Sequence, residues 1–442
     1  MRIENILKQN SRTYPEKVAV VSQGRMTTYS ELWKLVIRRA WAMRRAGVSK
    51  GSIHLFRASQ NIDFLLTYFA THLLGAVAAP LEHDMPEERF RQVQERAKSV
   101  EIPEETADIL FTTGTTGVSK GVMISGETII AEAENLADSQ GFRYDTVFVI
   151  SGPLNHIGSL SKVYPVVYVG ATLYITEGVK DMESFFNAFE YPSKSMATFL
   201  VPASIRMLLQ FAKERLSKLA DKIDFIETGA AAMAQSDMEE LCRLLPRTRL
   251  YNTYASTETG IIATHNFNSG YCVAGCLGKA MKHSRFYITE EGLIACEGKT
   301  LMVGYIGNDQ QGCVFRQNSV LVTSDRGYVD REGRLNLLGR ADDVINVGGY
   351  KVNPLEVENV ALSFPSVQDC ICISVHHTVL GSVLKLLVVP NEVMQFNKQE
   401  LALYIRSKLE SHKVPWQYEV VEFIHRTYNG KLDRKRYAVK DV

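Results

Sequence analysis

The sequence has few cysteines, almost no net charge and no long apolar segment. Seven cysteines among 442 residues make a low, odd count that does not predict a disulfide framework. The first seventeen residues, MRIENILKQNSRTYPEK, are polar where a signal peptide would carry an apolar stretch. These absences predict a reducing environment, and we expect a cytoplasmic location.

The balance of charge disfavours nucleic acid as a partner. Fifty basic and 49 acidic side chains give a net charge of +1, which leaves no positive excess to hold a phosphate polymer. The longest uncharged run to weigh as a membrane span, 64–81, contains Gly75 and Pro80. A buried helix at 62–74 followed by a short strand at 76–79 explains this run better. We therefore expect no membrane span.

Length and element pattern predict an α/β protein with at least two domains. The chain is 45% apolar, so it can bury a large core, and 442 residues exceed one ordinary domain. Helical and extended patterns alternate to about residue 265, which is typical of parallel sheets covered by helices. A small antiparallel β unit is expected at 270–338, and a compact α+β module follows it. We place the boundary between a large domain, 1–340, and a small mobile one, 341–442, with a hinge near Asp342.

Periodicity and turn residues place the individual elements. We expect helices at 3–10, 30–45, 62–74, 86–98, 354–362 and 398–410, the second of them capped by Ser30. Strands are expected at 18–22, 146–150, 171–175, 197–201, 225–227, 367–375, 383–389 and 418–424.

A stretch rich in glycine and threonine, ADILFTTGTTGVSKGVMIS at 107–125, indicates a phosphate-binding loop between two strands. Glycines let the backbone approach a ligand, hydroxyls and amides donate hydrogen bonds, and a lysine adds positive charge. A Walker loop has glycine before its lysine and a helix after it, and this stretch has neither. An ordinary hairpin loop with a solvated lysine is the alternative. The candidate phosphate ligands are Thr112, Thr113, Gly114, Thr115, Thr116, Gly117 and Lys120.

Five motifs in the same order resemble the adenylate-forming superfamily, which includes acyl-CoA and aryl-CoA ligases, luciferases and the adenylation domains of peptide synthetases. The loop at 112–121 resembles its signature loop. The other four are Tyr254-Ala255-Ser256-Thr257-Glu258, Thr323-Ser324-Asp325, Gly339-Arg340-Ala341-Asp342-Asp343 and Asn429-Gly430-Lys431. The resemblance covers nearly the whole chain and is specific for the reaction class, less so for the substrate.

The resemblance implies an ATP site built from dispersed side chains. Glu258 would hold Mg²⁺, which prefers one or two carboxylates together with phosphate oxygens and water. Asp325 would accept hydrogen bonds from the ribose hydroxyls, and Arg340 would contact the ribose or the phosphates. Without the resemblance, Glu258 could as well be an exposed glutamate that starts a helix. An aspartate such as Asp325 is usually only a turn former. The remaining adenosine candidates are Gly229, Ala230, Ala231, Asn252, Thr253, Thr257 and Tyr254, the last either stacked on the base or buried in the core.

The same resemblance assigns Lys431 to the reacting centre. In the family, a lysine at this position reaches from the small domain and binds the carboxylate and the α-phosphate while they react. Without the resemblance, Asn-Gly-Lys is a turn with an exposed lysine. Rotation about Asp342 would then withdraw the lysine and present a segment that guides a thiol. The candidates for that segment are Gly348, Gly349, Tyr350 and Lys351.

The segment PLNHIG at 153–158 resembles the acid-pocket segment of acyl-CoA and aryl-CoA ligases, with Asn155 in place of the usual aromatic residue. Amino-acid-activating domains carry an aspartate in this region, whereas 151–164 has no acidic residue. An unpaired substrate ammonium would be costly there, so an amino acid is disfavoured. Small and polar candidates favour a fatty or aromatic acid: Asn155, His156, Gly158, Ala255, Ser256 and Gly260.

We therefore predict an ATP-dependent carboxylic acid–thiol ligase that uses Mg²⁺ and coenzyme A, acts through an acyl-adenylate and relies on Lys431, His156 and Glu258. Loading of a phosphopantetheinyl carrier protein is the nearest alternative, and a catalytically inactive nucleotide-binding homologue is another. The interval 81–111 is shorter than in most relatives, as if a helix–strand unit were missing. The dimer surfaces and effector contacts of full-length relatives are therefore not carried over to this chain.

Overall fold

The computed structural model describes residues 2–98, 100, 102–112, 120–179, 181–306, 313–315, 319–377, 381–391, 396–427 and 431–437. No helix within these ranges is both long and apolar enough to cross a membrane. The α-helices are α1 Ile3–Thr13, α2 Tyr29–Arg45, α3 Ile62–Leu73, α4 Glu87–Lys98, α5 Gly126–Gln140, α6 Ile157–Val169, α7 Met182–Ala188, α8 Pro202–Phe211, α9 Lys213–Ser217, α10 Gln235–Leu244, α11 Pro354–Leu362, α12 Lys398–Lys408 and α13 Arg434–Tyr437, with 3-10 turns η1 Ala341–Asp343 and η2 Ser411–Lys413.

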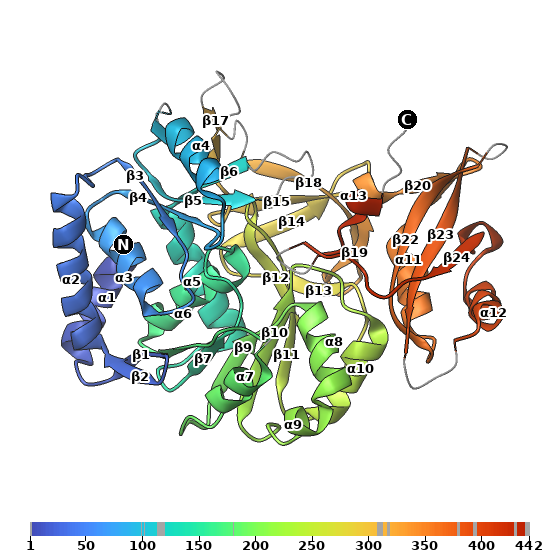
Figure 1. The fold of residues 1–442 in the computed structure, drawn as a ribbon, viewed down its shortest axis with the longest axis horizontal. Coiled ribbons are helices and arrows are strands. Elements are labelled where there is room, and N and C mark those ends of the chain that lie inside the picture. Colours follow the sequence, from blue (N-terminus) through green and yellow to red (C-terminus); the bar gives the residue numbers. More distant parts are fainter. Residues whose placement is uncertain are drawn as a thin grey trace.

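A long twisted sheet forms the framework, in the order β14-β15-β18-β19-β13-β12-β11-β10-β9-β7-β8-β1-β2. Its middle part, from β11 through β10, β9, β7 and β8 to β1, is parallel, and the rest is antiparallel (Figure 1). The strands are β1 Val18–Ser22, β2 Arg25–Thr28, β7 Val147–Ile150, β8 Thr172–Ile175, β9 Met196–Phe199, β10 Ile223–Gly229, β11 Arg249–Ser256, β12 Gly260–Asn266, β13 Cys276–Ala280, β14 Ser284–Ile288, β15 Leu293–Gly298, β18 Val320–Val329 and β19 Leu335–Arg340. The predicted α/β fold class is confirmed.

A second sheet has the order β17-β16-β6-β5-β4-β3. Its strands are β3 Ile53–Arg57, β4 Val77–Leu81, β5 Thr106–Thr112, β6 Lys120–Ser125, β16 Gly304–Ile306 and β17 Cys313–Phe315. The prediction that 270–338 makes one small β unit is wrong in this respect, because β16 pairs with β6 of the second sheet. The rest of that stretch extends the long sheet through the pairing of β12 with β13.

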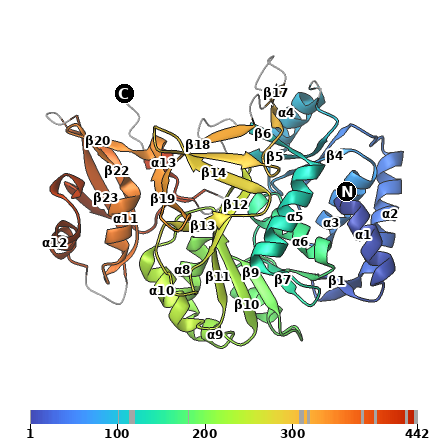
Figure 2. The ribbon, with the colours of Figure 1, turned by 180° about the vertical axis from the view of Figure 1, so that it is seen from behind.

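The chain after η1 forms two further sheets. A hairpin of β20 Ile345–Val347 and β21 Tyr350–Val352 precedes α11, and a three-stranded sheet contains β22 Val367–His377, β23 Gly381–Pro390 and β24 Gln417–Val420. A separate apolar cluster, with Val357, Leu386 and Leu401 at its centre, holds these elements together. This C-terminal unit lies beside α8, α10 and β19 in both ribbon views (Figures 1 and 2).

The main core lies where helices cover the parallel strands. Strand β7 is buried along its whole length, as expected for a strand with helices on both faces of its sheet. Helices α5 and α6 pack on each other and against α1 and β7. The rings of Phe142, Phe148 and Phe225 meet in this layer with centroids 5.1–6.0 Å apart. Such packing places α6 against β7 and β8.

Two local predictions need correction. The cap of α2 is Thr28, not Ser30, because its hydroxyl accepts from the Glu31 amide while the Glu31 carboxylate accepts from the Thr28 amide. Asp325, predicted in a turn, lies inside β18 opposite Arg340 of β19. The glycine-containing pattern around Asp325 produces an irregularity between Arg326 and Gly327 rather than a chain reversal.

Candidate active site

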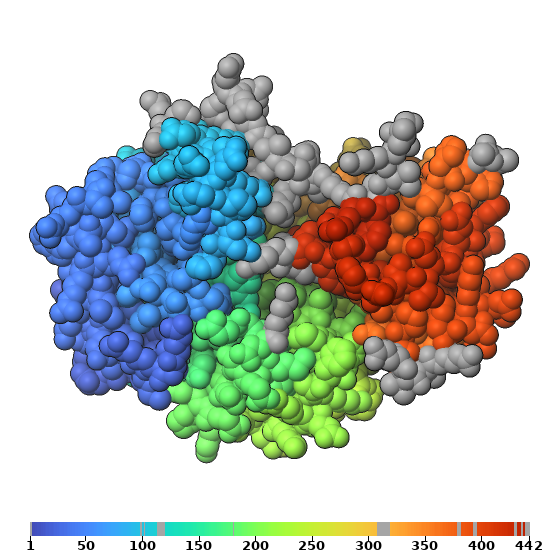
Figure 3. Space-filling view, viewed as in Figure 1, coloured from blue at the N-terminus to red at the C-terminus, as the bar shows by residue number. Residues whose placement is uncertain are grey.

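The predicted site residues gather at the carboxyl ends of the parallel strands. The segment with His156 follows β7, Gly229 ends β10 and Ser256 ends β11. Ligands of open α/β sheets bind at this edge, because loops leaving neighbouring strands meet there. In Figure 3, the red C-terminal segment faces the blue and green parts of the chain across a hollow. The arrangement is that of a site between the large sheet and the C-terminal unit.

The adenosine segment is shaped for close approach. A Cβ atom at Gly229 would lie 2.8 Å from the Thr253 carbonyl oxygen, so only glycine fits there. Ala230 has a φ of 68°, a left-handed conformation that is rare for residues with a side chain. The Asn252 amide donates to the Cys276 carbonyl at 3.0 Å and the Thr253 and Thr264 hydroxyls pair at 3.0 Å. These last two candidates therefore brace the strands with their side chains.

Asp325 is the centre of a polar group on neighbouring strands. The Tyr254 hydroxyl donates to its Oδ2 at 2.7 Å, and the Thr323 hydroxyl accepts from its amide at 3.1 Å. Arg340 lies 3.8 Å from Oδ1 and also pairs with Asp342 at 3.2 Å. Burial, with a contribution from Asp325, raises the pKa of Tyr254. Tyr254 thus holds the carboxylate in place, and the lone pairs left on Asp325 can accept from a diol.

Glu258 follows β11 in a short turn, and a strand comes after it where a helix was the alternative. The Tyr305 hydroxyl donates to Glu258 Oε1 at 3.3 Å, and Lys120 Nζ lies 5.2 Å from the centroid of the Tyr305 ring. No group of three potential protein ligands for a metal occurs in the part of the chain that the structure describes. One carboxylate that leaves the other positions to phosphate oxygens and water suits Mg²⁺. Tyr305 was not predicted as a site residue, because it reaches Glu258 only through the pairing of β16 with β6.

Most of the predicted phosphate loop lies outside the described residues, namely Thr113, Gly114, Thr115, Thr116 and Gly117, as do Asn429 and Gly430. The two ends of the loop are described and lie opposite each other, because Thr112 of β5 pairs with Lys120 of β6. The strands on both sides are those that the sequence predicted. Thr257 is described and partly exposed in the turn before Glu258.

Lys431 comes from the C-terminal unit into this group of charges. Its amide donates to the Thr427 hydroxyl at 3.2 Å, and its carbonyl accepts from the Thr427 amide at 2.8 Å. The residue keeps access to solvent, but burial of its amine and the nearby charge of Arg340 lower its pKa, opposed by Asp325 and Glu258. The charge of Lys431 in turn helps to lower the pKa of His156. The fold therefore brings four side chains that are distant in sequence, Arg340, Asp325, Glu258 and His156, within electrostatic reach of one amine.

The candidates for the acid pocket surround the start of α6. His156 is its N-cap, and burial, helped by Lys431, lowers the pKa of the imidazole to about 4, so the ring is neutral at physiological pH. Asn155 is buried, and a Cβ at Gly158 would lie 3.0 Å from the Phe199 ring. Ala255 and Ser256 are partly exposed, and the Ser256 hydroxyl accepts from the Thr259 amide at 3.0 Å. Gly260, with a φ of 65°, is buried beside Thr300.

The predicted hinge touches this group of charges through the Arg340–Asp342 pair, whereas the described contacts of Tyr350 in the thiol segment lie elsewhere. Asp342 is in η1, directly between β19 and β20. Gly348 and Gly349 form the tight turn of the next hairpin, with φ values of 54° and 94°. Tyr350 stacks on His412 with centroids 4.6 Å apart, and Lys351 is exposed. Their roles stay predictions.

A salt-bridge network joins the C-terminal unit to the part of the chain before η1, which we call the large sheet side. Arg206 of α8 pairs with Asp237 of α10 at 2.7 Å and with Asp369 of β22 at 3.5 Å. Arg426 also reaches Asp369, at 2.7 Å. These partly buried contacts connect β22 of the C-terminal unit with α8 and α10.

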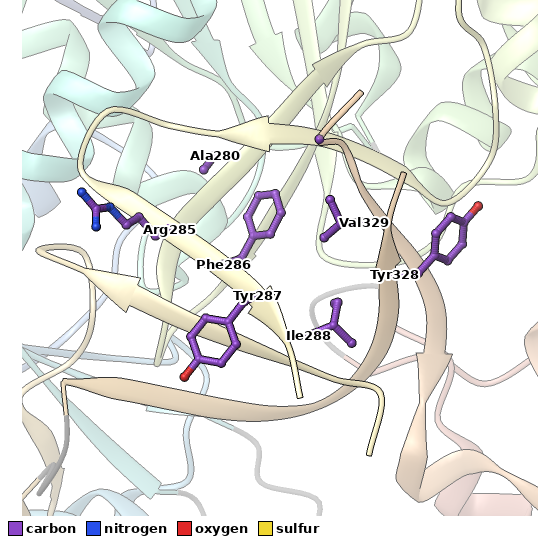
Figure 4. Close-up of a pocket in the computed structure, with 8 residues that line it drawn as sticks. Ala280, Arg285, Phe286, Tyr287, Ile288, Tyr328 and Val329 are labelled. Atoms are coloured by element: carbon purple, nitrogen blue, oxygen red, sulfur yellow. The ribbon is translucent and has the colours of Figure 1, made fainter. Parts of the chain in front are cut away.

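An open depression of about 690 Å³ lies elsewhere, on the antiparallel part of the long sheet (Figure 4). Its lining contains none of the predicted site residues, and the side chains drawn in Figure 4 come mainly from β14 and β18. We place the active site by the convergence of charged groups instead, because a concave apolar surface alone carries no chemistry. The lining residues are Ala280, Arg285, Phe286, Tyr287, Ile288, Tyr328, Val329 and Gly333.

Comparison with known families agrees with this geometry. The family described as "AMP-binding enzyme" matches residues 7–102 and 95–306, and "AMP-binding enzyme C-terminal domain" matches 356–431. The chain belongs to the family of AMP-binding enzymes, which confirms the resemblance to the adenylate-forming superfamily.

Several relatives span the whole chain. A putative long chain fatty acid-CoA ligase, VraA of Staphylococcus epidermidis, is 24% identical and covers 100% of this chain and 99% of its own. A 2-succinylbenzoate–CoA ligase of Listeria innocua is 25% identical, with 98% of both chains covered.

Two solved structures share the fold. The anthranilate CoA ligase AuaEII in complex with anthranoyl-AMP has a TM-score of 0.88 at 17% identity, covering 99% of this chain and 96% of its own. MenE of Bacillus subtilis in complex with ATP and magnesium ion has a TM-score of 0.82 at 23% identity, with 98% of both chains covered.

Proposed function

We propose that this enzyme is an ATP-dependent carboxylic acid–thiol ligase of the acyl-CoA or aryl-CoA synthetase type. In the first half-reaction, a carboxylate oxygen attacks the α-phosphorus of ATP, which forms an acyl-adenylate and releases pyrophosphate. In the second, a thiolate sulfur attacks the acyl carbon and releases AMP. The observation that carries the proposal is the convergence of Lys431, from the C-terminal unit, with Arg340, Asp325, Glu258 and His156.

The nucleotide would lie across the ends of β10, β11 and β18. Asp325, held by Tyr254, would accept from the ribose hydroxyls, and Gly229 would let the flat base lie against the backbone. The loop between Thr112 and Lys120 would take the triphosphate. Glu258 fits a Mg²⁺ site, and the ion when bound would neutralise part of the triphosphate charge. These groups position the α-phosphorus for in-line attack.

Lys431 would stabilise negative charge that develops on the reacting carboxylate and α-phosphate. Its lowered pKa reflects an amine that has lost hydration and gained Arg340 as a neighbour, so binding of an anionic triphosphate favours its charged form. Neutral His156 would border the acid and can donate or accept one hydrogen bond without adding charge.

The division of the chain at Asp342 supports a rotation between the two half-reactions. η1 separates β19 from the hairpin that carries the predicted thiol segment, and the C-terminal unit has its own apolar cluster. Rotation of the C-terminal unit about a few residues near Asp342 would withdraw Lys431 and bring Gly348 and Gly349 to the acyl carbon. Glycines there would let a slender pantetheine arm approach closely.

Coenzyme A is the acceptor that the named relatives favour, since they are called CoA ligases. A phosphopantetheinyl carrier protein would use the same thiol. Supplying one acyl-adenylate together with either coenzyme A or a carrier protein separates the two acceptors. Thioester formation with free coenzyme A at a rate no lower than that of AMP release supports the proposal.

Trapping with hydroxylamine tests the first half-reaction without assuming a thiol. Purified enzyme, Mg²⁺ and ATP are incubated with single fatty, aromatic and hydroxyaromatic acids, and hydroxamate and AMP are measured together. We expect equal amounts of both for the accepted acids. Release of AMP without hydroxamate, or hydroxamate without ATP, would contradict an adenylate intermediate.

A further inference from the structure

Three buried ionisable side chains lie beneath the predicted acid pocket, and none was identified from the sequence. Lys162 of α6 pairs with Glu227 of β10 at 2.8 Å, and the two side chains are 2% and 1% exposed. Glu132 of α5 is 1% exposed. The charges of Lys162 and Glu132 influence each other. We call Lys162, Glu227 and Glu132 the polar floor.

Contacts connect the polar floor to the pocket candidates. Gly158 and Lys162 are one helical turn apart on α6 and share a face. The Phe199 ring touches both: it lies 3.0 Å from the Cβ position of Gly158, and its centroid is 5.1 Å from Lys162 Nζ. Glu132 Oε1 lies 2.6 Å from the Cβ position of Gly260. The floor thus reaches two of the pocket candidates, Gly158 through the Phe199 ring and Gly260 through Glu132.

Strand β10 connects the polar floor to the adenosine segment. Glu227 precedes Gly229 by two residues on β10, so both side-chain positions face the same side of the sheet. Phe199 pairs with Glu227 on the neighbouring strand β9. A molecule that enters between His156 and Gly229 and passes Phe199 therefore meets the polar floor rather than apolar core.

The polar floor has unused hydrogen-bonding capacity. Both carboxyl oxygens of Glu132, and Oε2 of Glu227, are buried and have no hydrogen-bond partner among the residues that the structure describes. Such groups are strongly unfavourable in a folded interior unless something else pairs with them. Burial raises the pKa of Glu132 to about 8, so at neutral pH it is a carboxylic acid with an O–H to donate. Lys162 and Glu227 neutralise each other, which leaves one donor and unused acceptors without net charge.

We propose that the polar floor recognises a hydroxyl group at the far end of a short carboxylic acid, and so makes this enzyme a ligase for small hydroxy acids. A hydroxyl donates one hydrogen bond and accepts others, which matches an acceptor on Glu227 and an O–H on Glu132. This inference rests on the proposed ligase function and specifies its substrate class.

Other distal groups match less well. An alkyl tail would leave the oxygens of Glu132 and Glu227 unpaired and remove any water from them. A second carboxylate would bring negative charge beside two acidic residues, and the cation described beside them, Lys162, is already paired with Glu227. A substrate ammonium would need Glu132 to lose the proton that burial favours.

Matched pairs of acids test the substrate class on the wild-type enzyme. Benzoate is compared with its ortho-, meta- and para-hydroxy derivatives, and butyrate with its terminal hydroxy derivative, with decanoate, succinate and γ-aminobutyrate added. The readout is acid-dependent AMP formation with hydroxamate. We expect kcat/KM for the best hydroxy acid to exceed that of its parent by about 100-fold or more, because a site built to bond a hydroxyl rejects the analogue without it.

Variants of Glu132 link that preference to the polar floor. In Glu132→Leu we expect the preference for the hydroxy acid to fall to less than about threefold, and Glu132→Gln to retain part of it. Glu127→Leu is the matched control, since Glu127 lies on the same helix but is exposed and pairs with Lys299 at the surface. Its hydroxy-acid preference should equal that of the wild type.

Thermal unfolding separates recognition from structural support. Because Glu132 has no hydrogen-bond partner, Glu132→Leu should unfold at the same or a higher temperature than the wild type. Unfolding at a clearly lower temperature in both Glu132 variants would assign Glu132 to stability and overturn the inference. Equal use of parent and hydroxy acids, or a preference for decanoate, succinate or γ-aminobutyrate, would overturn it while leaving the ligase function intact. ATP cleavage to ADP would instead refute the ligase function itself.

Discussion

Lys431 is the side chain on which the proposed chemistry depends most. It lies among Arg340, Asp325 and Glu258, which are held by the large sheet side of the molecule. Replacing Lys431 with alanine removes positive charge at the reacting α-phosphate. We expect Lys431→Ala to lower the rate of adenylate formation by about 100-fold to 1,000-fold, as loss of one preorganised donor does in other enzymes. Acid-dependent pyrophosphate exchange measures this step.

The second half-reaction supplies the contrast. Thiolysis of a chemically prepared acyl-adenylate should proceed in Lys431→Ala at close to the wild-type rate, because the rotated enzyme would no longer use this amine. Lys408→Ala, at the end of α12, is the control and should change neither step. Equal loss of both half-reactions in Lys431→Ala would contradict the division of labour between two orientations.

Glu132 gives the stability of the protein a distinctive pH dependence. Its pKa is about 8 in the folded chain and near 4.5 in the unfolded chain, so folding takes up a proton between these values. The stabilisation is fully present below pH 4.5 and is lost as pH rises through about 8, with a slope of at most about 1.4 kcal/mol per pH unit. Urea denaturation of wild type and Glu132→Gln should show free energies that diverge over this range. Parallel pH profiles would show that Glu132 is ionised in the folded protein.

At the scale of elements, the strands and helices with strong local patterns were predictable. Helix α11 occupies the predicted residues 354–362, and the phosphate loop is flanked by β5 and β6 as expected. What failed were elements fixed by distant partners. Asp325 continues a strand because β19 pairs with it on one side and β15 on the other, and β16 joins β6 from far along the chain. Local sequence carries no record of such pairings.

The contact between α8 and β22 holds the C-terminal unit in the orientation that presents Lys431. Asp369 bonds both Arg206 and Arg426. Asp369→Asn should weaken this orientation by about 1 kcal/mol, the upper range for a partly exposed pair, and slow adenylate formation roughly fivefold. Thiolysis of a supplied adenylate should be unchanged or faster. Glu419→Gln, at an exposed pair with Lys385, is the control, and equal slowing of both steps would count against an orientation effect.

Arg434 ties helix α13 to the C-terminal unit through a pair with the buried Glu358. Arg434 donates to both carboxylate oxygens of Glu358 at 2.7 Å and to the Cys372 carbonyl at 2.9 Å. Arg434→Gln should reduce the free energy of unfolding of this unit by about 3–5 kcal/mol, since Glu358 is left buried without its cation. The exposed Arg436→Gln should cost less than about 0.5 kcal/mol. Chemical denaturation measures both, and similar small losses would show that the pair contributes little.

For the whole molecule, the site is a product of long-range folding. The motif residues Glu258, Asp325, Arg340 and Lys431 were predicted from sequence, because each lies in a recognisable local pattern, and the fold brings their charges within reach of one another. Tyr305 and the polar floor were not. Lys162 is the one charged residue of α6, whereas Glu132 is one of several acidic residues of α5 and Glu227 follows Asp224 on β10. Nothing local shows that the three would meet. The odd feature was a lysine in an apolar helix.

The assembled molecule explains why one chain can carry two chemical steps. In the proposed mechanism the large sheet side would hold the nucleotide and the acid. The C-terminal unit, with its own core, carries Lys431 on one segment and the hairpin of Gly348 and Gly349 on another. The described contacts between α8 and β22 are polar, so exchange between orientations is expected to be easier than unfolding either side.

Positional isotope analysis tests the central claim most directly. The wild-type enzyme is given ATP, Mg²⁺, coenzyme A and an accepted acid labelled with ¹⁸O in its carboxylate, so that thiolysis of the acyl-adenylate releases AMP, and the products are analysed by mass spectrometry. Attack of the carboxylate on the α-phosphorus predicts one labelled oxygen in AMP, with pyrophosphate unlabelled. Label in orthophosphate together with ADP, or AMP without label, would contradict the account.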